Sequence, residues 1–140
     1  MKTASGYTLQ LIGEDLKPLA EHEYCGQTYV GVTPSAKFSI RISGPTKAET
    51  IMRPEPRFLA VLSVDGRNPV DNTPAKRTGR GWVVSDSRTI CGWQVSATEV
   101  ANFYFAEPHR SYVARSGGES ASVGIISAAF FYEEEFDYGA

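Results

Sequence analysis

Short apolar runs separated by turn-forming residues are the feature that most constrains this chain. Within residues 57–105 the runs are rich in β-branched and aromatic side chains, and they occupy residues 58–64, 81–84, 89–93 and 100–105. Runs of this length, bounded by Gly, Asp, Ser and Pro, are typical of antiparallel β-structure. The pattern therefore indicates the fold class, although it supplies no catalytic group.

The remaining chain extends the pattern. Residues 37–43 alternate strictly, with Phe38, Ile40 and Ile42 on one face and polar side chains on the other, which predicts a strand with one face on a core and one in water. Residues 58–64 are almost continuously apolar, which predicts a central strand covered on both faces. The strands expected are residues 7–11, 24–32, 37–43, 58–64, 81–85, 88–93, 100–105 and 122–132, the last also central.

These elements predict an all-β protein with almost no helix. Each strand pair needs a second layer over its apolar face, so an antiparallel two-sheet β-sandwich or jelly roll of about eight strands is expected. Residues 81–85 and 88–93, joined by Asp86 and Ser87, predict a tight hairpin. The length of 140 residues suits one domain, expected over residues 1–132, with an acidic aromatic tail at 133–140.

Composition and charge exclude several classes of protein. Hydrophobic residues make up 41% and charged residues 21% of the chain, as in globular proteins rather than disordered ones. The net charge of -2 gives no overall positive field for a nucleic acid. No apolar stretch follows the N-terminal lysine, and no run approaches the roughly 20 residues of a membrane span. We expect a protein of the cytoplasm or of a virion, with no nucleic-acid or membrane partner.

Signals for catalysis are poor. The two histidines have no zinc-type spacing, and no nucleophile elbow, phosphate loop or dinucleotide fingerprint is present. Cys25 and Cys91 stand in apolar contexts, which predicts buried free thiols, with a single disulfide as the alternative. A Cys–His pair, either Cys91 with His109 or Cys25 with His22, is an open alternative, although a thiol embedded in an apolar strand is usually inert. Carboxylate pairs for glycoside hydrolysis are not visible in one dimension. We expect no enzymatic activity and no cofactor.

The loop at residues 67–80 is the first candidate site. It is expected to bury nothing, and its cations stand just before Trp82: Arg67, Lys76, Arg77 and Arg80. Such a loop suits a phosphate, an acidic sugar or an acidic protein surface, whereas the alternative is a solvated surface loop. In a homo-oligomer, the acidic residues 133–135 of one copy would complement this loop in the next.

Oxygen-bearing side chains gather in the same region, at Asp65, Asn68, Asp71 and Asn72. Hard cations such as calcium favour such clusters. Asx side chains also stabilise turns by bonding to their own backbone, and this alternative needs no metal.

Aromatic side chains give two further candidates. Trp82 and Trp93, on neighbouring predicted strands, would form a sugar-stacking platform if both were exposed, whereas the other reading places Trp93 in the core or an interface. Phe136 and Tyr138 lie beyond the last strand, where either an interface or disorder would account for them.

Several motifs together resemble those of a set of small, mostly uncharacterised bacterial and bacteriophage β-proteins. They are residues 62–68 (LSVDGRN), 81–84 (GWVV), 89–93 (TICGW) and 99–105 (EVANFYF), within a similarity over residues 29–132. The resemblance implies a compact β-domain, and its phage members imply a role in the virion. It transfers no functional residue, because the motifs carry no known chemistry.

The function expected is that of a non-enzymatic structural or interaction protein, such as a phage capsid decoration protein or another virion component. It would act as a homo-oligomer or bind a shell protein. The alternative is a carbohydrate-binding β-sandwich module, with Trp82 as its platform and Asp65, Asn68 and Asp71 as polar partners. A hydrolase is a third possibility.

Overall fold

The computed structural model describes residues 1–45, 57–96, 98–105 and 124–132, which form antiparallel β-structure and no helix. The all-β prediction is confirmed, with ten strands in this part of the chain rather than about eight, because residues 24–32 and 88–93 each contribute to two strands. The strands are β1 (Thr8–Ile12), β2 (Glu21–Tyr24), β3 (Gln27–Val30), β4 (Lys37–Ser43), β5 (Phe58–Val64), β6 (Trp82–Val84), β7 (Ser87–Ile90), β8 (Gly92–Gln94), β9 (Val100–Tyr104) and β10 (Ile126–Tyr132).

Strand β4 organises the larger sheet. One edge of β4 pairs with every residue of β1, from Ile12 opposite Ser39 to Thr8 opposite Ser43. The other edge has two partners, since its first residues pair with β9 and its last four with β7. The extended strand is interrupted at Cys91, which separates β7 from β8, and β8 then pairs with β9.

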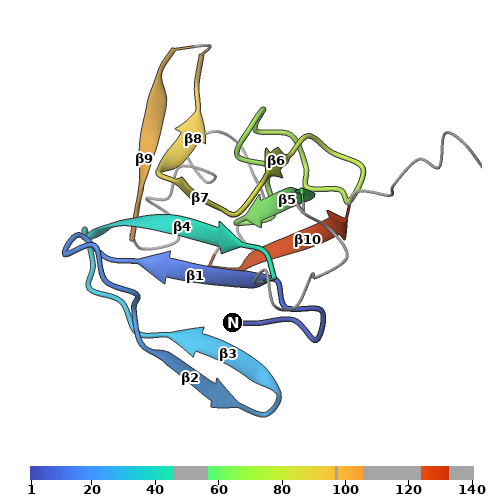
Figure 1. Ribbon diagram of the computed structural model, residues 1–140. Coiled ribbons are helices and arrows are strands. Elements are labelled where there is room, and N and C mark those ends of the chain that lie inside the picture. The colour runs from blue at the N-terminus through green and yellow to red at the C-terminus, as the bar shows by residue number, and fades with distance from the viewer. Residues whose placement is uncertain (46–56, 97, 106–123, 133–140) are drawn as a thin grey trace, which may run out of the picture.

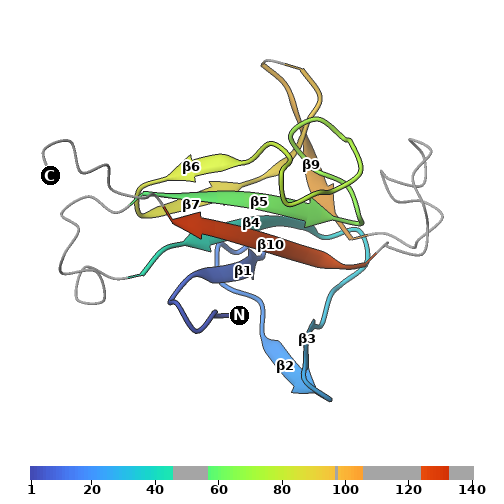
Figure 2. The same ribbon diagram turned by 90° about the vertical axis from the view of Figure 1, so that its right-hand side faces the viewer.

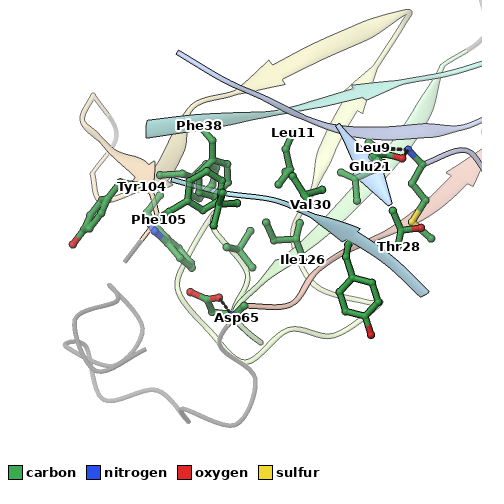
Figure 3. Close-up of a pocket in the computed structure, with 17 residues that line it drawn as sticks. Leu9, Leu11, Glu21, Thr28, Val30, Phe38, Asp65, Tyr104, Phe105 and Ile126 are labelled. Atoms are coloured by element: carbon green, nitrogen blue, oxygen red, sulfur yellow. Dashed lines mark hydrogen bonds and ion pairs between the residues drawn. The ribbon is translucent and has the colours of Figure 1, made fainter. Parts of the chain in front are cut away.

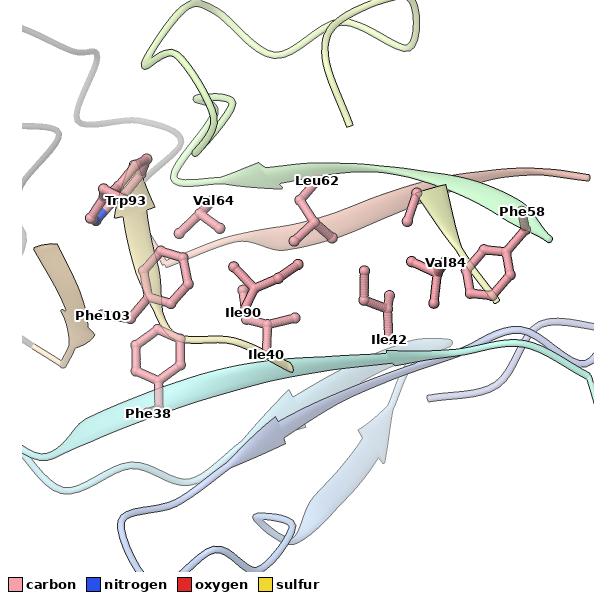
Figure 4. Close-up of a cluster of buried hydrophobic side chains, with 11 residues drawn as sticks. Phe38, Ile40, Ile42, Phe58, Leu62, Val64, Val84, Ile90, Trp93 and Phe103 are labelled. Atoms are coloured by element: carbon pink, nitrogen blue, oxygen red, sulfur yellow. The ribbon is translucent and has the colours of Figure 1, made fainter. Parts of the chain in front are cut away.

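The smaller sheet has the order β10-β5-β6 and covers the apolar face of the larger one. Alternate residues of β4 and β5 point between the two layers, as Figure 4 shows for Ile40, Ile42 and Leu62. Trp93 of β8 and Phe103 of β9 close one end of this core. Their rings pack edge to face, with 5.6 Å between the ring centroids. The alternation predicted for residues 37–43 and the central position predicted for residues 58–64 are confirmed.

Strands β2 and β3 form a separate hairpin, here called the arm, that projects from the sandwich in both views (Figures 1 and 2). Its turn is Cys25–Gly26, and both residues have positive φ, 51° and 77°, as in the type I′ turns that match the twist of paired strands. None of the buried core side chains comes from the arm. The arm is therefore an appendage of the sandwich.

Two expectations about strand pairing are wrong. Residues 81–85 and 88–93 do not form a hairpin, because β6 pairs with β5 and β7 pairs with β4, so the chain crosses from one sheet to the other at Ser85 and Asp86. The last strand is not central either: among the described strands β10 pairs only with β5. Each strand's position follows from its partners rather than from its own apolar content.

Candidate functional site

The loop at residues 67–80 is built around a buried asparagine, contrary to the expectation that this loop buries nothing. Asn68 is fully buried, its Nδ2 donates to the carbonyl of Arg80 at 2.7 Å, and its Oδ1 accepts from the Val70 amide at 2.9 Å. The neighbouring Pro69 is buried as well, and its carbonyl accepts from the Gln94 amide at 2.8 Å. The loop is thus fastened to β8, and Asn68 serves as a structural residue.

Asp65 begins the tight turn that follows β5. Asp65 and Gly66 have φ values of 54° and 78°, and the flanking Val64 and Arg67 exchange both backbone hydrogen bonds. The Asp65 amide donates to the carbonyl of Ile125 at 2.9 Å, and its Oδ1 accepts from the amide of Gly124 at 2.7 Å. Burial raises the pKa of the Asp65 carboxyl, and the bond from Gly124 opposes this shift.

The predicted cations separate into two groups. Arg67 is half-buried, and its guanidinium donates to the carbonyl of Asn72 at 3.0 Å, so it helps to hold the loop. The exposed cations of the loop are Lys76, Arg77 and Arg80. These three remain available for an acidic partner.

Asp65, Asn68 and Asp71 have hydrogen-bond partners among the described residues, whereas Oδ1 of Asn72 is buried and has none there. Asp71 accepts from both the hydroxyl and the amide of Thr73, and the hydroxyl bond is the main reason that the pKa of Asp71 is lowered. Asn68 and Asp71 each bond to the backbone amide two residues later, as in Asx turns, whereas Asp65 bonds to the amide of Gly124, 59 residues away. The described residues contain no cluster of three or more His, Cys, Asp or Glu side chains suited to a metal ion.

The two tryptophans lie in different sheets. Trp93 is buried in the core, as expected for that residue. Trp82 is half-buried and packs against the same core from β6. They do not form one exposed platform. Phe136 and Tyr138, the other aromatic candidates, lie outside the described residues.

The two cysteines are free but not buried, so the prediction of buried thiols is wrong. Cys25 lies in the turn of the arm, and Cys91 lies at the break between β7 and β8, where its carbonyl accepts from the Phe103 amide. Because the break interrupts the alternation of side chains, Cys91 and Trp93 do not share a face as a continuous strand would require.

The arm is a surface that the sequence did not reveal. All four residues of β2 are exposed, Tyr24 and Tyr29 are 71% and 50% exposed, and Val32 follows them with an exposed side chain. Among the described strands, β2 and β3 pair only with each other, so each has an unpaired edge. A two-stranded hairpin is at best marginally stable by itself. Unpaired edges of this kind favour pairing with another chain.

An apolar pocket of about 350 Å³ lies between the arm and the sandwich (Figure 3). Strands far apart in sequence form its walls, with Leu11 from β1, Val30 from β3 and Ile126 from β10. Aromatic residues and the Asp65 carboxyl line another part, where Figure 3 labels Phe38, Tyr104 and Phe105. Its volume lies at the lower end of the range for small-molecule sites.

At the arm's base, Glu21 also lines this pocket. The ammonium group of Met1 contacts both carboxylate oxygens of Glu21 at 2.7 Å and donates to the carbonyl of Leu9 at 3.0 Å. These contacts connect the arm to β1. The two carboxylates that line the pocket, Glu21 and Asp65, therefore differ in their ion pairing, since Glu21 has a cationic partner and Asp65 has none among the described residues.

No family model matches this chain, and no match to curated proteins or to solved structures was found. No helix in the described residues is long and apolar enough to cross a bilayer.

Proposed function

We propose that this chain is a non-enzymatic structural protein that assembles with copies of itself, in the role of a phage capsid decoration protein or another virion component. The observation that carries the proposal is the projecting arm, with its unpaired strand edges and exposed tyrosines. Tyrosine is enriched in protein interfaces because it offers a large contact area at a low entropic cost. The resemblance of the sequence motifs to those of small bacterial and bacteriophage β-proteins also favours a virion role.

Charge complementarity supports a second copy as the partner. Glu21 of the arm is already paired with the ammonium of Met1, so the carboxylate that the arm offers is that of Glu23. The exposed cations Lys76, Arg77 and Arg80 lie on the loop after β5. The arm and this loop lie on opposite sides of the molecule in both views (Figures 1 and 2). A contact between the arm of one copy and the loop of the next is heterologous, and such contacts form closed rings when the rotation allows it.

Light scattering coupled to size-exclusion chromatography tests the assembly. We expect a species larger than the monomer that grows with protein concentration and persists at high salt, because apolar contacts remain when charges are screened. Replacing Tyr24 and Tyr29 together by serine should yield a monomer. The matched control is Val83→Ser, which removes a side chain 63% exposed on β6 without altering the arm.

A charge exchange identifies the contact. Arg77→Glu should weaken assembly, and adding Glu23→Lys to the same chain should restore it, since the pair then meets with its charges reversed. A wild-type protein that stays monomeric at every concentration contradicts the proposed function. Assembly that is unaffected by the double tyrosine variant contradicts the role of the arm.

A further inference from the structure

Asp65 lines the pocket between the arm and the sandwich, and no described residue forms an ion pair with it. Its Oδ1 accepts the hydrogen bond from Gly124, whereas its Oδ2 receives none from the described residues. No basic side chain of the described chain forms an ion pair with it. Asp65 is half-buried, and the partial desolvation of an unpaired carboxylate is unfavourable.

Aromatic rings line the same part of the pocket. Phe105 is half-buried and stacks on Phe38 with 4.3 Å between the ring centroids, and Tyr104 is 37% exposed beside it. Figure 3 labels Phe38 and Phe105 on the same side of the pocket as Asp65, whereas the ring of Tyr104 points outwards. The faces of aromatic rings carry negative charge density and attract cations, most strongly where water is excluded.

We propose that this pocket binds a small organic cation, namely a primary or methylated ammonium group on a compact apolar body, with Asp65 as the ion-pair acceptor. The apolar body would contact Leu11, Val30 and Ile126, which gives affinity by removing apolar surface from water. An anion of the same size would bring a charge of the same sign towards Asp65. Glu21 is the weaker acceptor, because the ammonium of Met1 already contacts both of its oxygens.

Calorimetric titration of the full chain with four eight-carbon probes tests this inference. The probes are octylamine, octyltrimethylammonium, octan-1-ol and octanoate, each kept below the concentration at which it forms micelles. We expect both cations to bind at least about tenfold more tightly than the alcohol. Octylamine donates a charge-assisted hydrogen bond to Asp65, whereas octyltrimethylammonium has no donor and gains from charge attraction and contact with the aromatic rings. Octanoate should bind most weakly.

The Asp65→Asn variant tests whether Asp65 is the cause of the pocket's preference for cations. The amide keeps the shape of the side chain and an oxygen that accepts from Gly124. The affinity for both cations should therefore fall to that for the alcohol, while the affinity for the alcohol is unchanged. The matched control is Asp71→Asn, an exposed carboxylate on the neighbouring loop that does not line the pocket. It should alter none of the four affinities.

Val32→Trp places a bulky ring at an exposed position on the rim of the pocket and should weaken every probe. Equal affinity for octylamine and octan-1-ol, or an unchanged cation preference in a folded Asp65→Asn protein, overturns the proposal. If Asp65→Asn does not fold by circular dichroism, then unaltered binding to Val32→Trp overturns it. Assembly is tested separately by the Arg77→Glu and Glu23→Lys exchange, because neither of these residues lines the pocket.

Discussion

Asn68→Ala should destabilise the protein substantially, because Asn68 joins two points of the long loop from a fully buried position. The substitution leaves the Arg80 carbonyl and the Val70 amide without their side-chain partners, bonds of 2.7 and 2.9 Å in the native protein. Each unsatisfied group costs about 1–3 kcal/mol, reduced where water enters the space that the side chain vacates. With the small cavity, the expected loss is about 2–4 kcal/mol, a large fraction of a typical domain's stability.

Urea unfolding followed by tryptophan fluorescence measures this loss. At a typical urea dependence, the midpoint should fall by about 1–2 M with an unchanged slope. The control is Asp71→Ala in the same loop: this carboxylate is exposed and bonds only to Thr73 among the described residues, so its removal should cost less than about 1 kcal/mol.

Asn68→Asp refines the test, because it keeps the acceptor for Val70 and replaces the donor to Arg80 with an oxygen. Two oxygens then face each other at neutral pH, so this variant should be less stable than the wild type. It should recover at low pH, where the protonated carboxyl again donates. A loss below about 1 kcal/mol for Asn68→Ala, or a neutral-pH stability of Asn68→Asp equal to the wild type, refutes the structural role of this residue.

Four further outcomes are expected. Because the pKa of Asp65 is raised in the folded protein, the folded state binds more protons than the unfolded state between the folded and unfolded pKa values of this group. The free energy of unfolding should therefore fall as pH rises through this range. The Asp65→Asn variant should show a flatter dependence of urea stability on pH there, and an unchanged dependence would contradict this. Gly81→Ala should lower the thermal midpoint, because a Cβ there overlaps the carbonyl of Ala60, and unchanged melting contradicts this. Amides of β2 and β3 should exchange with deuterium before those of β4 and β5, and equal protection would mean that the arm is part of the core unit. Cys25 should react with a thiol reagent in the folded protein as fast as after denaturation, and full protection would contradict its exposure.

The parts of the fold that depend on alternation were predictable from the sequence. Residues 37–43 carry the period of two that a half-buried strand imposes, and β4 has these bounds. Residues 58–64 lack it because the second face of β5 is covered as well, with Val61 buried and Leu59 half-buried. In both cases the pattern reports the burial of the strand itself.

Strand partners were not predictable in this way. The link between β6 and β7 contains residues that also suit a hairpin, and only the pairings with β5 and β4 show that the chain changes sheet there. The strand expected at residues 24–32 runs through Cys25–Gly26, because this pair lacks the Asn or Asp typical of type I′ turns. The turn signal was the glycine between two short alternating stretches.

The candidate sites were predictable only in part. The Asp65–Gly66 turn is visible in the sequence, and Lys76, Arg77 and Arg80 are exposed as a basic surface loop requires. The pocket could not be found, since its walls come from strands at both ends of the chain. Nothing in the sequence marks Asn68 as buried, because an asparagine in a polar loop has the same local signature whether or not the loop folds over it.

Strand β4 has consequences for how the chain acquires its fold. Its neighbours along the two edges come from residues 8–12, 87–90 and 103–104. The second edge therefore stays open during translation until about sixty further residues have left the ribosome, and its closure is a non-local event of high contact order. We expect folding in milliseconds to seconds rather than microseconds, with the nascent edge of β4 as the point most in need of chaperone protection.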